Sequence, residues 1–585
     1  MSAQGGQSQV IGSGASAVGP PPPLRAREWA VLGAGTLVGA VLLLLRLGEQ
    51  PFWDDEALTA FFGRSIARTG KPTALYGENL NSERNGLELF PDLTDRVFPQ
   101  VCFYVTAASF KLFGVSTFTG RVPHALLGLA TIPAVFWAAD RWFRDRRLAL
   151  AAACVLAIWV PFLLFARQCR YYAAVMLLAT ILWGLYPDIS LRRWKRLALV
   201  CLAMLLMFHS HYFLTIAFVL ALGTLALAER DWRKLAALAV GGVFLAACVL
   251  PWYLWFQANR HPDTQDYAFP NADPRSAARL VYLLLCAVNR FNVGQLLFVP
   301  IGLAVLVWGW RRHRVWRGAF LRLVGLLAFL TVFTAILFPL EGRADWTPER
   351  FVDIRYLSSA VPLFCACMTV IAAQLFRWNR VAGGLVMAAF AATDVPALRL
   401  GDITYRQFNR LASPINAKVD LPFRSYLADY LVELAWGQDS VYGRVLRFLE
   451  ERAQPGDTIL TCPRYHSQPI LFYLGDRLRV CGMLEETESH ILPANRHRIA
   501  PHVYRTDFAP KWIVSTIGTL DSPAFDRTIR RLAARYRTHH LEIWVGHLTR
   551  PELGRRMFRP VYPPDPGQQV VVYERVDSPT PAAEL

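Results

Sequence analysis

Three consecutive carboxylates, Asp54, Asp55 and Glu56, follow directly after the first apolar span of the chain. Acidic side chains beside a membrane span are costly to place there and usually serve a function. A carboxylate at the membrane interface could take the proton of an acceptor hydroxyl as a general base. The structural alternative is that Asp54 or Asp55 caps the helix that follows, and that Glu56 complements the helix dipole.

The helix that follows is predicted over about residues 57–68, because its large apolar side chains recur at helical spacing. Those side chains are Leu58, Phe61, Phe62 and Ile66, whereas Arg64, Ser65 and Arg68 lie elsewhere on the helix. Gly70 and Pro72 should end it. An amphipathic helix of this kind would lie flat at the membrane surface. It would then hold the three carboxylates at headgroup depth, where a lipid phosphate would sit.

A second candidate site is the short turn at residues 166–172, between two spans without charges, which carries Arg170, Tyr171 and Tyr172. Arginine forks bind phosphate or carboxylate through two parallel hydrogen bonds, and tyrosines can stack on sugars or hydrogen-bond to them. The alternative is an interfacial belt of arginine and tyrosine that reaches up to the lipid headgroups.

Two further turns offer polar side chains at the mouths of spans. His209 and His211 flank a similar turn, and a histidine there could be structural or could contact a substrate. Arg355 and Tyr356 open a later span, so Arg355 is either a phosphate ligand or a headgroup anchor. We interpret His211, Arg355 and Tyr356 as substrate-binding residues.

The elements that must position these residues are membrane helices. Of 585 residues, 54% are hydrophobic, and long apolar runs recur from Trp29 to Thr393. The sequence therefore predicts a multi-spanning α-helical membrane protein with about eleven transmembrane helices and additional juxtamembrane helices. The expected spans are 29–47, 120–139, 148–166, 171–187, 197–208, 212–228, 235–256, 291–310, 319–340, 356–376 and 381–393.

The net charge of +18 follows from where the arginines and lysines lie. If the apolar segment 98–113 lies in the interface rather than crossing the bilayer, every strongly basic loop falls on one side. Those loops are 25–27, 141–147, 192–196, 230–234, 311–317 and 377–380. The basic side is expected to be cytoplasmic, which places the outer loop 48–119 and the C-terminus on the extracytoplasmic side. The charge therefore indicates topology, and nucleic acid is not expected as a partner.

The chain divides into four predicted parts: a disordered cytoplasmic N-terminus at 1–28, a transmembrane module at 29–395, an irregular connector at 396–439 and a small extracytoplasmic α/β domain at 440–585. Short strands are expected in this last domain at 458–462, 478–481, 512–515, 541–545 and 570–573, with helices at 441–453, 465–473 and 523–536. Cys462 and Cys481 could pair there or stay free.

The segment Trp53-Asp54-Asp55-Glu56-Ala57 resembles a motif of the GT-C membrane glycosyltransferases, which use polyprenyl-phosphate sugars. This group includes protein O-mannosyltransferases and the aminoarabinose transferases of lipid A. The resemblance extends over about residues 29–395. Its other marks are the segment 98–114, Arg121-Val122-Pro123, the turn 167–172, His211-Tyr212, Arg355-Tyr356 and Pro362.

The resemblance implies that Asp55 is the catalytic base or orients the acceptor, with Glu56 beside it. Many relatives carry an acidic residue where this chain has Gln168, so a metal or acceptor role of that acid is not carried over. No cofactor is expected with certainty, and a need for a divalent metal stays open.

The expected function is transfer of a sugar from a polyprenyl-phosphate donor to a lipid, glycan or protein acceptor. It would occur with inversion on the periplasmic side of the bacterial inner membrane. One alternative is a non-catalytic subunit of envelope-polymer assembly or export, against which the intact Asp55–Glu56 pair argues. The other alternative is a transporter. The spans of a transporter often carry charged residues near the midplane and show an inverted repeat, whereas the spans predicted here are almost free of charges.

Overall fold

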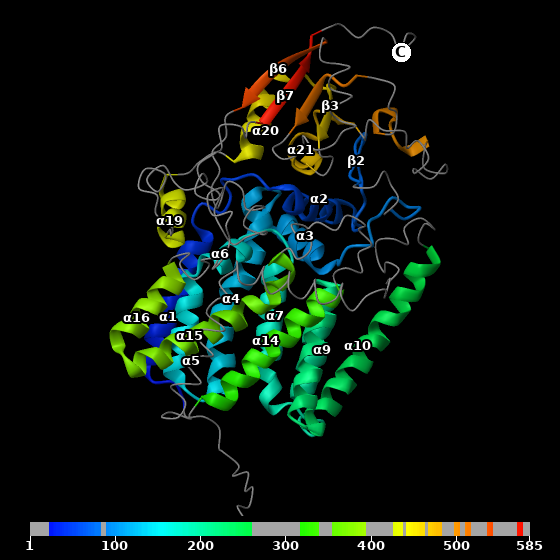
Figure 1. The fold of residues 1–585 in the computed structure, drawn as a ribbon. Helices are drawn as coiled ribbons and strands as arrows, with labels where there is room; N and C mark the ends of the chain where they lie inside the picture. Colours follow the sequence, from blue (N-terminus) through cyan, green and yellow to red (C-terminus); the bar gives the residue numbers. More distant parts are fainter. Residues whose placement is uncertain are drawn as a thin grey trace, which may run out of the picture.

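A computed structural model of the chain consists of a helical bundle with a small sheet domain at one end (Figure 1). The structure describes residues 23–82, 89–259, 316–337, 354–392, 425–436, 440–462, 466–481, 497–503, 509–515, 535–541 and 570–576. The predicted architecture, a multi-spanning helical membrane protein with a C-terminal α/β region, is confirmed in this form.

The bundle is built from long apolar helices that run roughly side by side (Figure 1). They are α1 Ala26–Leu44, α4 Thr117–Phe143, α5 Arg146–Ile158, α6 Val160–Ala166, α7 Tyr172–Leu185, α8 Trp194–Phe208, α9 Tyr212–Ala228, α10 Trp232–Asn259, α14 Arg317–Leu337, α15 Val361–Trp378 and α16 Arg380–Ala392. Most predicted spans overlap one of these helices. The span 148–166 is divided between α5 and α6, and 291–310 lies outside the described residues.

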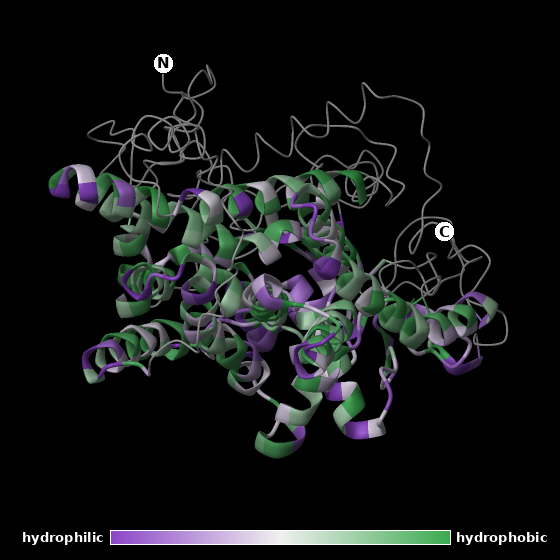
Figure 2. Ribbon diagram, turned by 90° about the horizontal axis from the view of Figure 1, so that it is seen from below, coloured by the Kyte–Doolittle hydropathy of each residue, from purple (hydrophilic) through white to green (hydrophobic). Residues whose placement is uncertain are grey.

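Length and composition separate these helices into two groups. Among the described residues, five helices are long and apolar enough to cross a membrane, and the bent pair α5–α6 makes a sixth. The remaining apolar helices of the bundle are shorter. The number of eleven spans therefore stays a prediction. Seen along the bundle, the helices are mostly hydrophobic, with hydrophilic residues mainly in loops and at helix ends (Figure 2).

The α5–α6 bend positions the turn that carries Arg170. The helix axis bends by 64° between α5 and α6, and Trp159 at the bend has an extended conformation. Pro161 at the start of α6 lacks a backbone N–H, which a helix interior would need but a first turn does not. The α4 backbone comes close at this point, since a Cβ on Gly128 would lie 2.5 Å from the Cβ of Ala166.

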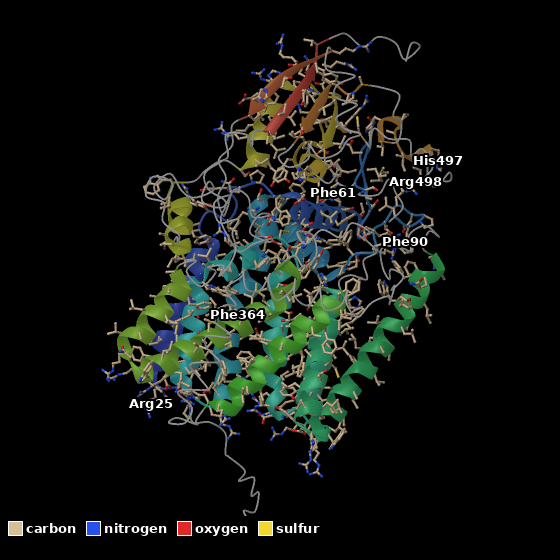
Figure 3. The ribbon with its side chains drawn as sticks, viewed as in Figure 1. Arg25, Phe61, Phe90, Phe364, His497 and Arg498 are labelled. Atoms are coloured by element: carbon tan, nitrogen blue, oxygen red, sulfur yellow. The ribbon has the colours of Figure 1, made fainter. Side chains whose placement is uncertain are left out.

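The predicted basic loops meet at the end of the bundle that lies far from the sheet domain. Arg141 at the end of α4 pairs with Asp188 in the 3-10 helix η1, Tyr186–Asp188. Arg377 at the end of α15 lies 3.6 Å from Asp145, which precedes α5. Arg25 lies at this same end (Figure 3). Ion pairs therefore join loops that are far apart in the sequence.

Two shorter helices, α2 Asp54–Thr69 and α3 Val101–Phe113, lie between the bundle and the sheet domain (Figure 1). Gly70 ends α2 in the left-handed conformation with φ 77°, as the sequence predicted. The 13 residues of α3 extend only about 20 Å, less than the roughly 30 Å of a bilayer core. Exposed apolar side chains on α3, Tyr104, Leu112 and Phe113, suit a position in the interface.

The position of α2 at the membrane surface stays a prediction, but its polar side chains are not exposed. Arg64 and Ser65 are each only 7% exposed. The C-terminal helix α21, Ser467–Leu474, packs on α2 and contacts Arg64, whereas Ser65 donates to the carbonyls of Lys71 and Thr73. Arg64 donates from Nη1 to the carbonyl of Phe472 at 2.8 Å, and its guanidinium lies 3.8 Å from the centre of the Tyr76 ring.

Among the described residues of the C-terminal domain, five strands form a mixed sheet in the order β4-β3-β5-β7-β6. β3 pairs in parallel with β4 and β5, whereas β7 pairs antiparallel with β5 and β6. Its elements are α20 Val441–Arg452, β3 Thr458–Cys462, β4 Arg479–Val480, the 3-10 helix η9 Pro501–Val503, β5 Trp512–Ser515, β6 Tyr536–Leu541 and β7 Val570–Arg575.

Most predicted elements of this domain are confirmed, whereas the strand 541–545 and the helix 523–536 are not found at their predicted positions among the described residues. β6 begins at Tyr536, where a helix had been predicted to end, and reaches only the first residue of the predicted strand 541–545. The rest of that strand and most of the predicted helix 523–536 lie outside the described residues. The connector is not wholly irregular, because it contains the helix α19, Tyr426–Trp436. Cys481 is a buried free thiol.

The C-terminal domain is anchored to the segment that carries the carboxylates. The Tyr473 hydroxyl accepts the backbone N–H of Phe52 at 3.0 Å and lies 2.7 Å from the Thr117 hydroxyl. A short hairpin of β1 Leu75–Tyr76 and β2 Asn79–Leu80, which the sequence had not predicted, also contacts the domain. Asn79 donates to the carbonyls of Gly475 and Leu478, both at 2.8 Å.

Candidate active site

The three carboxylates lie in the first turn of α2 and point in three directions. The prediction that Asp54 or Asp55 is the N-cap is wrong, because the N-cap residue is Trp53 and the helix already includes Asp54. Glu56 does lie in the first turn, where an acidic residue complements the helix dipole. Successive residues of a helix are rotated by about 100°, so neighbours cannot face one substrate together. Asp54 approaches His466 of the C-terminal domain at 4.0 Å, Asp55 faces a cavity and Glu56 faces the bundle.

Glu56 is completely buried and holds two parts of the protein together. Arg121 of α4 donates to its two oxygens, from Nε at 2.8 Å and from Nη2 at 2.6 Å. The backbone N–H of Cys169, in the turn before α7, donates to Glu56 Oε1 at 2.7 Å. Glu56 does not line the cavity. Its side chain therefore fixes α2 against the turn that presents Arg170.

Arg121 completes this arrangement from the other side. Its Nη1 donates to the carbonyls of Leu47 and Gln50 at 3.0 and 2.7 Å, and its Nη2 to that of Pro51 at 3.1 Å. The sequence placed Arg121 in a motif but did not predict which residue it would pair with. The signal that could have found this role is a charged residue at the edge of an apolar span, which needs a buried counter-charge.

Asp55 lies between two arginines that the sequence had placed at separate mouths of spans. Arg355, in the 3-10 helix η5 Ile354–Ala360, donates from Nη1 to Asp55 Oδ2 at 2.6 Å. Arg170 Nη2 lies 3.6 Å from Asp55 Oδ1. Arg170 Nη1 also donates to the Asp55 carbonyl at 3.1 Å and to the Thr59 hydroxyl at 3.0 Å. Three residues that are far apart in the sequence thus form one charged cluster.

This cluster forms one end of a cavity of about 510 Å³. Its polar side chains include Asp55, Thr59, Arg170, Tyr171, Ser210, His211, Tyr212, Tyr253, Arg355 and Tyr356. The larger part of the wall is apolar or aromatic and comes mainly from α3 with the segment before it, from α9 and from α10. Phe98, Phe103, Phe213, Ile216, Val249, Leu250, Trp252 and Phe256 are among its residues. The sequence did not predict this second wall, because such residues are ordinary in membrane helices. The cavity can hold a ligand that is charged at one end and apolar over the rest.

Aromatic rings surround the charged cluster. The His211 ring lies edge-on to Tyr171 and to Tyr356, with centroid distances of 4.4 and 5.9 Å. Tyr356 also accepts a hydrogen bond from Arg355 Nη2 at 2.9 Å. Burial, with the nearby guanidinium groups of Arg170 and Arg355, lowers the pKa of His211 to about 3. The ring is therefore neutral at ordinary pH, and because Nδ1 accepts the Leu214 N–H at 3.4 Å, Nε2 carries the proton.

Two of the sequence-predicted positions lie away from the cavity wall. Tyr172 is fully buried and packs against Phe165 and Tyr171, with ring centroids 4.9 and 4.5 Å apart. Gln168 donates to the Leu164 carbonyl at 3.0 Å within its own turn. Neither residue lines the cavity. A direct contact of Tyr172 with substrate is not supported, and its ring instead supports the Tyr171 ring.

Metal binding has no candidate among the described residues. Within them, no group of three or more histidine, cysteine, aspartate or glutamate side chains could hold a metal ion. Of the residues that the structure describes, two guanidinium groups and one carboxylate carry the charges that face the cavity.

Comparisons with known proteins agree with this architecture. Residues 98–255 match the family described as dolichyl-phosphate-mannose-protein mannosyltransferase. The fold is similar to ArnT from Cupriavidus metallidurans in the apo state, with a TM-score of 0.52, 18% identity, and coverage of 94% of this chain and 98% of ArnT. The undecaprenyl phosphate complex of ArnT gives a TM-score of 0.52 and 17% identity over 95% of this chain and 100% of ArnT. A search of curated proteins finds no match.

The chain therefore shares the fold of ArnT, and residues 98–255 match the mannosyltransferase family model. Both findings agree with the resemblance to the GT-C membrane glycosyltransferases drawn from the sequence.

Proposed function

We propose that the protein transfers a sugar from a polyprenyl-phosphate donor to an acceptor hydroxyl on the extracytoplasmic face of the membrane. The observation that carries this proposal is the two-part cavity, in which Asp55, Arg170 and Arg355 form a charged end and the rest of the wall is apolar. The undecaprenyl phosphate bound to ArnT, which has a similar fold, supports the same class of ligand.

The cavity matches the donor part by part. Arg170 and Arg355 bind the donor phosphate, because guanidinium forks bind phosphate oxygens with charge-assisted hydrogen bonds. The first isoprene units lie along the apolar wall that α3, α9 and α10 provide. Tyr171, His211 and Tyr356 surround the charged end and contact the sugar or the phosphate.

In the proposed reaction, Asp55 accepts the proton of the acceptor hydroxyl while its oxygen attacks the anomeric carbon. The bond between that carbon and the phosphate oxygen breaks, and the electron pair leaves with the polyprenyl phosphate. The departing phosphate thereby gains one negative charge, which the two arginines stabilise. A single attack from the side opposite the phosphate inverts the anomeric centre. Glu56 positions α2 and does not touch the reacting atoms.

The membrane orientation rests on the basic loops. The cavity lies at the end of the bundle next to the sheet domain, whereas Arg25 and the ion-paired loops lie at the other end (Figure 3). We assign the basic end to the cytoplasm by the positive-inside rule. The cavity and the C-terminal domain then face the periplasm of a bacterial inner membrane, where lipid, glycan and protein acceptors are all accessible.

The test is to incubate purified protein with a set of undecaprenyl-phosphate sugars and follow which lipid loses its sugar. Asp55→Asn keeps the shape of the side chain and removes the base, so turnover should fall roughly 10²–10⁴-fold. Asp54→Asn is the matched control and should stay active, since Asp54 does not line the cavity. Full activity of Asp55→Asn would refute the assignment of the base. No consumption of any polyprenyl-phosphate sugar by the wild type would refute the proposed function.

A further inference from the structure

Asp55 interacts with the same two arginines that the proposed function assigns to the donor phosphate. We propose that, without donor, Asp55 takes the place of the phosphate, and that donor binding displaces it and so frees its oxygens to act as the base. This inference rests on the proposed function and adds to it a coupling between donor binding and base activation.

The first argument is the distribution of contacts over the carboxylate. Arg355 contacts Oδ2 and Arg170 contacts Oδ1, so each guanidinium group faces a different oxygen. Each carboxylate oxygen has two lone pairs, and here Arg355 takes one of those on Oδ2 while Arg170 lies near Oδ1. A base needs a lone pair directed at the acceptor hydroxyl. Turning the carboxylate away from both arginines would free all of its lone pairs for an acceptor.

The second argument is that the arginines are held in place without the Asp55 carboxylate. Arg170 Nη1 is fixed by the Thr59 hydroxyl and by the backbone carbonyl of residue 55. Arg355 Nη2 is fixed by the Tyr356 hydroxyl. When the carboxylate turns away, the α2 backbone and both guanidinium groups can stay where they are. A site for one anion between the two arginines then remains.

The third argument is that Arg170 is incompletely satisfied by Asp55. Its Nη2 lies 3.6 Å from the carboxylate, longer than a hydrogen bond, and its buried Nε has no hydrogen-bond partner among the described residues. Nε and Nη2 form the edge of a guanidinium group that binds phosphate through two parallel hydrogen bonds. A phosphate has more acceptor oxygens than a carboxylate and could satisfy both arginines at once.

The exchange also assists product release. During transfer Asp55 takes up a proton, while the polyprenyl phosphate gains a negative charge and binds the arginines more strongly. Once Asp55 loses this proton to water, it is again an anion beside Arg170 and Arg355. It then competes with the phosphate for both arginines. A single side chain would therefore act as the base and as the competitor that releases the spent lipid.

The experiment measures the affinity of undecaprenyl phosphate for wild type, Asp55→Asn and Asp54→Asn in the same detergent or nanodisc. Removing the competing charge should tighten binding to Asp55→Asn roughly tenfold or more, a ratio that corresponds to about 1.4 kcal/mol. Asp54→Asn should bind as the wild type does. Unchanged or weaker binding by Asp55→Asn would overturn the inference. If Asp54→Asn bound undecaprenyl phosphate as tightly as Asp55→Asn, the inference would also be overturned. The loss of any nearby negative charge would then explain the higher affinity.

A second measurement needs only the wild type, in case Asp55→Asn does not fold. A polyprenyl methyl phosphodiester keeps a single negative charge at every pH used, unlike a phosphate monoester. Its affinity should rise as the pH falls and Asp55 is neutralised, whereas an affinity independent of pH would overturn the inference. Among the described residues, the other titratable or charged groups beside Asp55 or in the cavity are Asp54 with His466, Glu56, Cys102, Arg170, Tyr171, His211, Tyr212, Tyr253, Arg355 and Tyr356. Of these, His211 stays neutral over most of the range because its pKa is about 3.

These results are distinguishable from a failure of the proposed function. If the wild type neither binds undecaprenyl phosphate nor consumes its sugar conjugates, the proposed function fails and the inference fails with it. If the wild type transfers sugar but its affinity responds neither to Asp55→Asn nor to pH, only the inference fails.

Discussion

Replacing Glu56 by glutamine is expected to destabilise the protein far more than replacing the neighbouring Asp55 by asparagine. Glu56 is fully buried, and its oxygens accept three hydrogen bonds, two from Arg121 and one from the Cys169 N–H. Removing one partner of a buried ion pair leaves the other charge uncompensated, at a cost of about 3–5 kcal/mol. The Asp55 side chain is 16% exposed, so water can partly replace its lost contacts.

The assay is thermal unfolding of the purified variants in one detergent, with turnover measured at a temperature where each variant is folded. Glu56→Gln should lower the melting temperature by several degrees, and its remaining activity should follow the folded fraction. Asp55→Asn should melt close to the wild type and be nearly inactive. The double variant Glu56→Gln/Arg121→Gln should lose less stability than the sum of the two single variants, because it leaves no unpaired charge.

One result would refute this reasoning directly. If Glu56→Gln had the melting temperature of the wild type and still lost turnover as Asp55→Asn does, Glu56 would take part in the chemistry. A double variant that is less stable than the sum predicts would show that Arg121 and Glu56 do not act as a pair.

The other predictions concern the donor phosphate, the docked domain and the topology. Replacing Arg170 or Arg355 by lysine should raise KM for the donor, since the bidentate fork is lost; unchanged KM in both variants would make them headgroup anchors. Arg64→Met keeps an unbranched side chain in place of the arginine stem but removes the hydrogen bonds to the α21 carbonyls, so the C-terminal domain should be cut from the bundle more readily by limited proteolysis. Unchanged cleavage would show that other contacts hold the domain. Reporter fusions after residues 147 and 234 should read as cytoplasmic, and fusions near 115 and at the C-terminus as external. A cytoplasmic reading near 115 would mean that α3 crosses the membrane.

Much of the fold and the polar end of the cavity could be predicted from the sequence. Apolar runs locate membrane helices because the bilayer allows few alternatives for the backbone. The one-sided basic loops then assign every other turn to the opposite face. That is why Asp55, Arg170 and Arg355 were expected on one face. Along the chain, Arg170 lies 115 residues from Asp55, and Arg355 lies 300 residues from it.

The roles of neighbouring residues could not be read from the sequence. Asp55 and Glu56 are both acidic, and only the orientation of the α2 first turn directs one into the cavity and the other to Arg121. The apolar wall was missed because its aromatic residues do not differ from ordinary membrane-helix residues. The burial of α2 was missed because the side chains that cover it come from α21, whose contact depends on long-range packing.

The docking of α21 on α2 has a consequence for how the protein matures. The hydrogen bond from Arg64 to the Phe472 carbonyl joins positions 408 residues apart. At about 5–20 residues per second, synthesis of the intervening chain takes roughly 20–80 s. During that time α2, with its carboxylates, can pack on α3 but has not yet met α21. The amphipathic pattern that predicted a surface helix suits α2 to the membrane surface during this interval. The same sequence thus suits α2 first to the lipid surface and later to the contact with α21.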